Sequence, residues 1–164
     1  MRVAGLVQDS IVDGPGFRFV VFVQGCKQRC EGCHNPDTLD AGGGEEIAVE
    51  ELVSRMRSNP LTDGLTISGG EPLLQAGDCT RLAAAARESG LNVWVYTGYT
   101  FEHLLSKVDE CPGIGELLKL ADVLVDGAFV LAERTLSLRW RGSRNQRLVD
   151  VPKSLARGAA VELQ

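Results

Sequence analysis

The 164-residue sequence lacks the features that mark membrane-bound and secreted proteins. No apolar run is long enough to span a bilayer, and the first residues do not form a signal peptide. Basic residues are too few for general nucleic-acid binding, because 17 lysines and arginines face 22 carboxylates. Repeats and linkers are absent as well, so we expect residues 1–164 to form a single domain. We therefore predict a cytoplasmic protein without a membrane or nucleic-acid partner.

Cysteine is also scarce, and its distribution is uneven. Five cysteines are an odd number for a disulfide scaffold, and a small secreted protein would be denser in cysteine. Three of them, Cys26, Cys30 and Cys33, lie close together, whereas the other two stand alone. A structural zinc site usually has four ligands from two such groups, and His34 is too close to Cys33 to be a comfortable fourth ligand.

The spacing CxxxCxxC therefore favours an iron–sulfur cluster over zinc. Cubane clusters normally have four cysteine ligands. Ligation by Cys26, Cys30 and Cys33 alone would leave one iron without a protein ligand and free to bind another molecule. A non-catalytic zinc or iron–sulfur binding module remains open as an alternative from another functional class.

Strand and helix patterns alternate along most of the chain. Apolar runs predict strands at residues 18–23, 65–67, 91–96 and 122–125. Apolar residues at helical spacing predict helices at residues 45–58, 78–89 and 101–108, with a further turn at 114–120. We expect residues 3–16 to be turn-rich and residues 139–147 to be irregular or partly extended. The alternation predicts an α/β fold with a mainly parallel sheet, and the units are too few for anything but an incomplete, open barrel.

A polar segment follows each predicted strand. In chain order these segments are the cysteine loop, Gly69-Gly70-Glu71, Thr97-Gly98 and Asp126-Gly127. We expect them to converge, because the carboxyl ends of parallel strands share one edge of a sheet. Adjacent glycines let a ligand approach the backbone closely, and Glu71 could accept hydrogen bonds from an ammonium group.

The cysteine loop followed by Gly69-Gly70-Glu71 resembles the radical S-adenosylmethionine superfamily. Two further motifs, Asp13-Gly14-Pro15-Gly16 and Cys33-His34-Asn35, resemble the activating enzymes of glycyl-radical enzymes. The short chain, Tyr96-Thr97-Gly98-Tyr99, Val123–Gly127 and Trp140-Arg141-Gly142-Ser143 are similar to the branch that activates the anaerobic ribonucleoside-triphosphate reductase. An activase of another glycyl-radical enzyme, such as pyruvate formate-lyase, is the alternative within this family, although those relatives are longer.

The resemblance implies an incomplete, open (β/α) barrel of the radical SAM type with two cofactors. One [4Fe–4S] cluster per chain would be held by Cys26, Cys30 and Cys33. S-adenosylmethionine would bind the open iron, with Gly32, Cys33 and His34 against its adenosyl group and Gly69, Gly70 and Glu71 at its amino end. Gly32 stands where many superfamily members have an aromatic residue that contacts adenine, so His34 or a backbone group would make that contact.

The resemblance also implies a reaction and its partners. A low-potential donor such as reduced flavodoxin would supply one electron, which cleaves S-adenosylmethionine into methionine and a 5′-deoxyadenosyl radical. That radical would take a hydrogen atom from a glycine Cα of the reductase and leave a glycyl radical there. No side chain is assigned a catalytic role, because the cofactors carry the chemistry.

Two features and one substitution complete the predictions. Asp126 resembles a family acidic position near the ligand, with its role left open. Residues 139–147, which are rich in arginine, either form a solvated surface or recognise a carboxylate of the ligand or of the reductase. The substitution Gly70→Val is expected to spare the cluster and to weaken the binding of S-adenosylmethionine.

Overall fold

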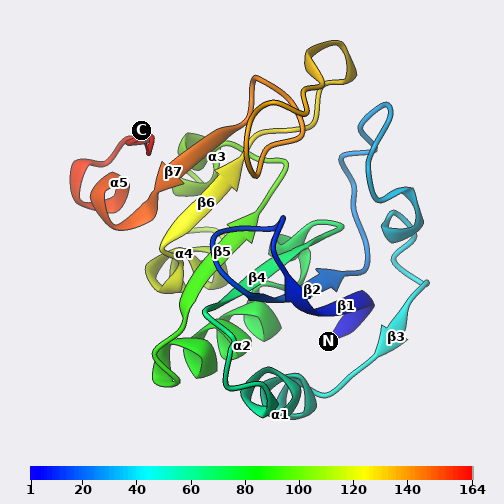
Figure 1. Ribbon diagram of the computed structural model, residues 1–164. Coiled ribbons are helices and arrows are strands. Elements are labelled where there is room, and N and C mark those ends of the chain that lie inside the picture. Colours follow the sequence, from blue (N-terminus) through cyan, green and yellow to red (C-terminus); the bar gives the residue numbers. More distant parts are fainter. Residues whose placement is uncertain (164) are drawn as a thin grey trace.

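One mixed sheet of seven strands organises the computed structural model, which describes residues 1–163 (Figure 1). The strands are β1 (Arg2–Ser10), β2 (Arg18–Val23), β3 (Glu45–Glu46), β4 (Gly64–Gly69), β5 (Asn92–Tyr96), β6 (Val123–Asp126) and β7 (Arg147–Asp150). Their order across the sheet is β3-β1-β2-β4-β5-β6-β7. The four central strands, β2, β4, β5 and β6, run parallel, whereas β1, β3 and β7 pair antiparallel with their neighbours.

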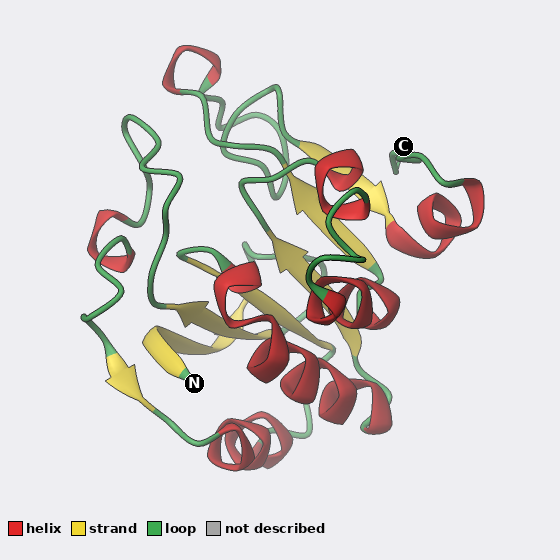
Figure 2. Ribbon diagram, turned by 180° about the vertical axis from the view of Figure 1, so that it is seen from behind, coloured by secondary structure: helices red, strands yellow, loops and turns green. Residues whose placement is uncertain are grey.

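The α-helices lie against one face of this sheet (Figure 2). They are α1 (Val49–Ser58), α2 (Ala76–Glu88), α3 (Phe101–Leu105), α4 (Pro112–Leu120) and α5 (Val151–Arg157). Three short 3₁₀ helices, η1 (Pro36–Thr38), η2 (Pro72–Gln75) and η3 (Leu131–Glu133), lie in the loops. Within residues 1–163, no helix has both the length and the apolar character needed to cross a bilayer.

The main core forms between the helices and the sheet. From α1, Leu52 and Met56 are fully buried, and they belong to the same cluster as Phe19 of β2, Ile67 of β4 and Val95 of β5. Burying an apolar side chain of this size contributes about 1.5–3 kcal/mol. The near-continuous apolar character of β2 follows from its central position, because both of its faces are covered.

The opposite face of the sheet is covered by loops among the described residues. A second, smaller cluster lies there, built on Trp94, Val123 and Val125 with Trp140 packed against it. The rings of Trp94 and Trp140 meet edge to face at 5.1 Å. This face carries the polar cavity described below.

Arg18, at the start of β2, is fully buried, and no described carboxylate forms an ion pair with it. Its guanidinium donates to the hydroxyl of Thr66 at 3.0 Å and to the carbonyl of Leu65 at 2.6 Å. The hydroxyl of Thr66 in turn donates to the carbonyl of Asp13 at 2.8 Å. Burial lowers the pKa of Arg18 to about 10. Arg18 and Thr66 therefore tie the loop of residues 11–16 to the sheet.

The four predicted strands and the parallel centre of the sheet are confirmed, but several predicted boundaries are wrong. Residues 3–16 were expected to be turn-rich, yet Arg2–Ser10 form β1 along β2. The helix predicted at residues 45–58 begins only at Val49, because Glu45 and Glu46 pair with β1 instead. Residues 147–150 form β7, which pairs antiparallel with β6.

Candidate functional site

The loops that follow β2, β4, β5 and β6 meet around one cavity of about 400 Å³. The predicted convergence of the four polar segments at one edge of the sheet is therefore confirmed. Its lining includes Cys26, Cys30, Cys33, His34, Gly69, Gly70, Glu71, Thr97, Gly98 and Gly127. Gly32 and Asp126 were also singled out from the sequence, and both lie outside this lining.

The cysteine loop alternates between the cavity and the solvent. Cys26, Gln28 and Cys30 line the cavity, whereas Lys27 and Arg29 are exposed. The base of the loop is fixed by backbone hydrogen bonds, such as the one from Gly25 N to the carbonyl of Thr38 at 2.7 Å. This alternation gives the loop an inner face with thiols and an outer face with cations.

All three thiols of the loop are unpaired and half-buried. Burial raises the pKa of the Cys26 thiol, so metal ligation there requires release of its proton. In residues 1–163, no three His, Cys, Asp or Glu side chains are gathered closely enough to hold a single metal ion. Three cysteines along one wall of a cavity nevertheless fit a multi-iron cluster, because each thiolate then binds a different iron.

Gly69 and Gly70 attach the loop after β4 to the base of the cysteine loop. Gly70 N donates to the carbonyl of Val23, and Glu71 N to the carbonyl of Gly25, both at 2.8 Å. A Cβ at Gly70 would lie 2.3 Å from that same Gly25 oxygen. Gly69 has φ +99°, a conformation that favours glycine. Two bare backbone positions therefore border the cavity where two loops touch.

Glu71 is 1% exposed, and protein donors already surround its carboxylate. The hydroxyl of Thr97 lies 2.9 and 3.0 Å from its two oxygens, and the backbone N–H groups of Gly98 and Leu73 donate at 3.0 and 3.2 Å. Burial raises the pKa of Glu71, and these hydrogen bonds oppose that shift. Glu71 thus fastens the loop after β4 to the loop after β5.

Residues 128–146, here called the wall segment, lie opposite the cysteine loop. The rings of His34 and Phe129 are 4.5 Å apart, and a Cβ at Gly142 would lie 2.9 Å from Cε1 of His34. A Cβ at Gly32 would meet Leu131 at 2.8 Å. The sequence indicated His34 and Gly32, but it gave no signal that Phe129 and Leu131 would contact them.

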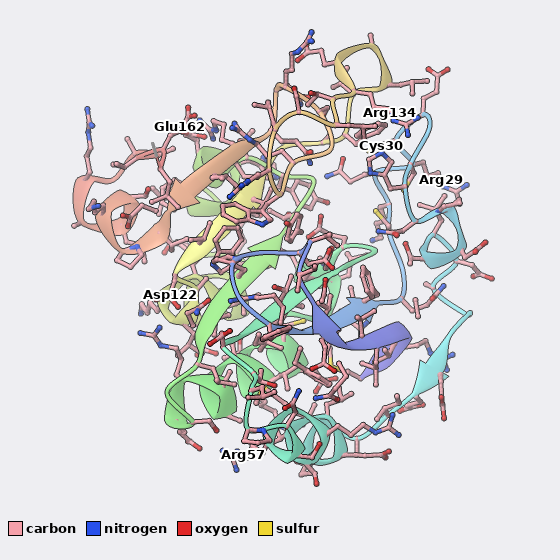
Figure 3. The ribbon with its side chains drawn as sticks, viewed as in Figure 1. Arg29, Cys30, Arg57, Asp122, Arg134 and Glu162 are labelled. Atoms are coloured by element: carbon pink, nitrogen blue, oxygen red, sulfur yellow. The ribbon has the colours of Figure 1, made fainter. Side chains whose placement is uncertain are left out.

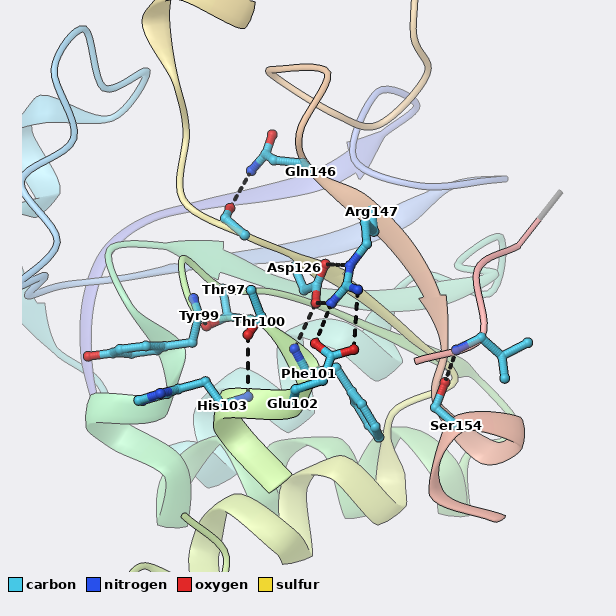
Figure 4. A network of polar contacts seen from close by, with 12 residues as sticks. Thr97, Tyr99, Thr100, Phe101, Glu102, His103, Asp126, Gln146, Arg147 and Ser154 are labelled. Carbon is cyan, nitrogen blue, oxygen red and sulfur yellow. Dashed lines mark hydrogen bonds and ion pairs between the residues drawn. The ribbon is translucent and has the colours of Figure 1, made fainter. Parts of the chain in front are cut away.

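Asp126 and Arg147 form a structural network beside the cavity (Figure 4). Asp126 is 1% exposed and accepts from the backbone N–H of Phe101 at 2.7 Å and from Arg147 at 2.5 and 2.9 Å. Arg147 also pairs with Glu102 at 2.7 Å. Hydrogen bonds to Asp126 and Glu102 raise the pKa of Arg147. The last residue of the arginine-rich segment therefore holds β7 and α3 to the end of β6.

The second histidine, His103, lies on the surface. It is exposed, and its ring stacks on that of Tyr99 at 5.1 Å, with an interplanar angle of 11°. The pair is drawn in Figure 4 beside the loop after β5. Tyr99 connects it to the main core, so His103 supports this loop from outside and is not part of the cavity lining.

Three thiols in the loop after a central parallel strand fit the ligand set of an iron–sulfur protein. The family model described as a 4Fe-4S single cluster domain matches residues 12–149. This match extends from the loop before β2 to β7 and includes the cavity, the cysteine loop and the wall segment.

Relatives of known activity narrow the class. The chain is 39% identical over 146 residues to the anaerobic ribonucleoside-triphosphate reductase-activating protein of Enterobacteria phage T4, covering 85% of this chain and 87% of that protein. The protein of the same name from Escherichia coli K12 is 37% identical over 150 residues, covering 84% and 90%. The pyruvate formate-lyase-activating enzyme of Clostridium pasteurianum is 40% identical over 117 residues, but the chain spans only 49% of its length. The chain belongs to the 4Fe-4S family of anaerobic ribonucleoside-triphosphate reductase-activating proteins.

Proposed function

We propose that this protein is a radical S-adenosylmethionine activase that generates the glycyl radical of an anaerobic ribonucleoside-triphosphate reductase. The observation that carries the proposal is the common cavity of Cys26, Cys30, Cys33 and the Gly69-Gly70-Glu71 segment. A site for a cluster alone would not need a second, glycine-lined segment at the same edge of the sheet. The two together provide one place for metal and one for an organic ligand.

In this proposal Cys26, Cys30 and Cys33 hold one [4Fe–4S] cluster and leave one iron for the ligand. The donor set supports this assignment, since three thiolates fall one short of the usual four. The five unpaired cysteines favour the reducing cytoplasm as the place where such a cluster is kept.

S-adenosylmethionine would lie between the cysteine loop and the loop after β4. Cys33 and His34, which line the cavity, would contact its adenosyl group, with the ring of His34 already held against Phe129. Gly32, the third residue expected there, lies outside the cavity lining. Gly69 and Gly70 would receive the amino end, since bare backbone lines the cavity there. Glu71 would lie at the same amino end, where its buried carboxylate accepts hydrogen bonds from Thr97 and Gly98.

When bound, the cluster and S-adenosylmethionine supply a one-electron reductive cleavage that yields methionine and a 5′-deoxyadenosyl radical. The protein's part is to bind, orient and shield these groups from water. The partner would present a glycine Cα at the cavity, where its hydrogen atom is removed. A low-potential donor such as reduced flavodoxin would supply the electron.

The fold supports the same proposal. We infer that the sheet is an incomplete, open (β/α) barrel of the radical SAM type, with residues 1–164 as one domain. The parallel order β2-β4-β5-β6 supports this, because it brings four loops to one rim, as in a barrel. Activation of pyruvate formate-lyase is not favoured, because the chain matches only 49–50% of the activating enzymes with that name.

Reconstitution with iron and sulfide under anaerobic conditions tests the proposal. We expect about four irons per chain, reductive cleavage of S-adenosylmethionine with dithionite, and a glycyl radical on the reductase in the electron paramagnetic resonance spectrum. The variant Cys30→Ala should lose the cluster, whereas the matched control Cys111→Ala, changed at an exposed cysteine far along the chain, should keep it. A colourless protein with one zinc per chain would refute the proposal.

A further inference from the structure

The outer face of the cysteine loop carries cations that the cavity does not use. Lys27 and Arg29 are exposed and lie outside the cavity lining, on either side of Gln28, which lines it. Neither cation forms an ion pair with any described carboxylate. Figure 3 shows Arg29 at the outer rim of the molecule, next to Cys30. Only the thickness of one loop therefore separates these two cations from the thiols.

A third cation reaches the same rim from the wall segment. Leu131 packs against the cysteine loop at Gly32, and Arg134 follows at the end of η3. Arg134 is exposed, and in the view of Figure 3 it lies toward the same edge of the molecule as Arg29 and Cys30. We call Lys27, Arg29 and Arg134 the basic rim.

The basic rim is opposite in sign to the molecule as a whole. Residues 26–34 and 128–144 together contain six lysines and arginines but only two carboxylates, Glu31 and Glu133, whereas the net charge of the chain is −5. Most other cations are neutralised locally, as in the pairs Arg87–Asp122 and Arg147–Asp126. A patch with a net positive charge on a protein with a negative net charge attracts acidic partners by long-range steering.

The proposed function requires one electron from outside, and the cavity side of the thiols is already assigned. S-adenosylmethionine and the partner's glycine would fill the cavity, so a third molecule cannot reach the thiols from that side. The outer face of the cysteine loop is the other route from solvent, because Lys27, Arg29, Glu31 and Gly32 on this loop are all exposed.

We infer that the basic rim is the docking surface for an acidic protein that carries one low-potential electron. This inference rests on the proposed function and adds the electron's point of entry. The carrier is oxidised by one electron and the cluster is reduced by one, with no atom or proton transferred. Electron-transfer complexes are small and transient, which fits three exposed cations on a narrow rim.

Charge reversal at two separate segments tests the inference. The variant Lys27→Glu, Arg134→Glu, loaded with its cluster, is mixed with an acidic flavodoxin reduced to its low-potential state. Reduction of the cluster is followed by the loss of its visible absorbance. The affinity of the oxidised flavodoxin for the same variant is measured by calorimetric titration. The matched control is Lys119→Glu, which reverses an exposed cation on α4.

At low ionic strength we expect the rate constant for reduction of the cluster by flavodoxin to be about tenfold lower in the variant than in the native protein. This difference should largely disappear near 0.5 M salt. The dissociation constant should rise by a similar factor. Dithionite needs no docking, so near 0.5 M salt, where its negative charge is screened, it should reduce native protein and variant equally. Unchanged rate and affinity would overturn the inference, as would an equal loss in Lys119→Glu. Slower reduction of the variant by dithionite near 0.5 M salt would place these residues in the cluster site itself and would also overturn the inference. If the native protein holds no cluster, the proposed function fails before this comparison begins.

Discussion

The substitution Gly70→Ala tests whether the two halves of the site are joined as the structure shows. A single added methyl group would place Cβ 2.3 Å from the carbonyl oxygen of Gly25, which is backbone and cannot swing away. The same oxygen accepts the hydrogen bond from Glu71 N at 2.8 Å. The methyl group must therefore push the loop after β4 away from the base of the cysteine loop.

Two effects lower the free energy of unfolding of Gly70→Ala. Forcing an extra methyl group into a packed position costs about 1–3 kcal/mol. Weakening the hydrogen bond from Glu71 to Gly25 costs about a further 1 kcal/mol. A domain of this size loses about 2–4 °C in Tm per kcal/mol, so Tm should fall by roughly 4–16 °C. Gly70→Val, which the sequence alone suggested would spare the cluster, should therefore lower the iron content too. Its added atoms press on the cysteine loop as well as on the ligand site.

Thermal unfolding of the iron-free protein, followed by circular dichroism, measures the first effect, and iron content after reconstitution measures the second. The control is Gly77→Ala in α2, where nothing lies within 4 Å of an added Cβ. Alanine should stabilise that helix by about 0.5–1 kcal/mol, so the same chemical change should raise Tm. A Gly70→Ala protein with native Tm and native iron content would refute the reasoning.

Three further predictions concern buried polar groups. Burial raises the pKa of Glu71 above 4.5, so Glu71 in the folded protein keeps its proton at a pH where the unfolded chain has lost it. The unfolding free energy of the native protein should therefore fall relative to that of Glu71→Gln as the pH rises from about 4.5 towards 7. Parallel pH profiles of the two proteins would contradict this prediction. Thr97→Val removes a donor from that carboxylate and should cost about 1–3 kcal/mol in urea unfolding, with no loss if Thr97 is incidental. Arg147→Ala leaves buried Asp126 without its cation and should cost about 2–3 kcal/mol, compared with less than about 0.5 for exposed Arg157→Ala; equal values would sink the reasoning.

The central strands could be predicted from the sequence because burial on both faces requires an apolar composition that is visible in the sequence. A strand such as β2, covered on both faces, needs apolar residues at nearly every position, and Arg18–Val23 show that pattern. β1 could not be found in this way, since Arg2–Ser10 include glycine and several polar residues. Pairing with β2 makes β1 a strand, and that partner lies later in the chain.

The site was predictable to a similar degree. Cysteine spacing and the order of loops along a parallel sheet placed Cys26, Cys30, Cys33 and Gly70 at one rim. The opposite side of the cavity was not predictable, because Phe129 meets His34 only through the path of an irregular segment. The environment of Glu71 was missed for the same reason, since its partners lie on the next loop and pairing across loops leaves no local pattern.

The absence of α-helices from one face of the sheet, among the described residues, has a consequence for how the protein works. Loops and strand ends border the cavity without any residue of an α-helix, and Val12 in its lining is 72% exposed. If the proposed function holds, the activator by itself cannot keep water away from a reactive species as an enclosed barrel would. The substrate protein then covers the open side of the cavity, and the cavity is closed only while the two proteins are bound to each other.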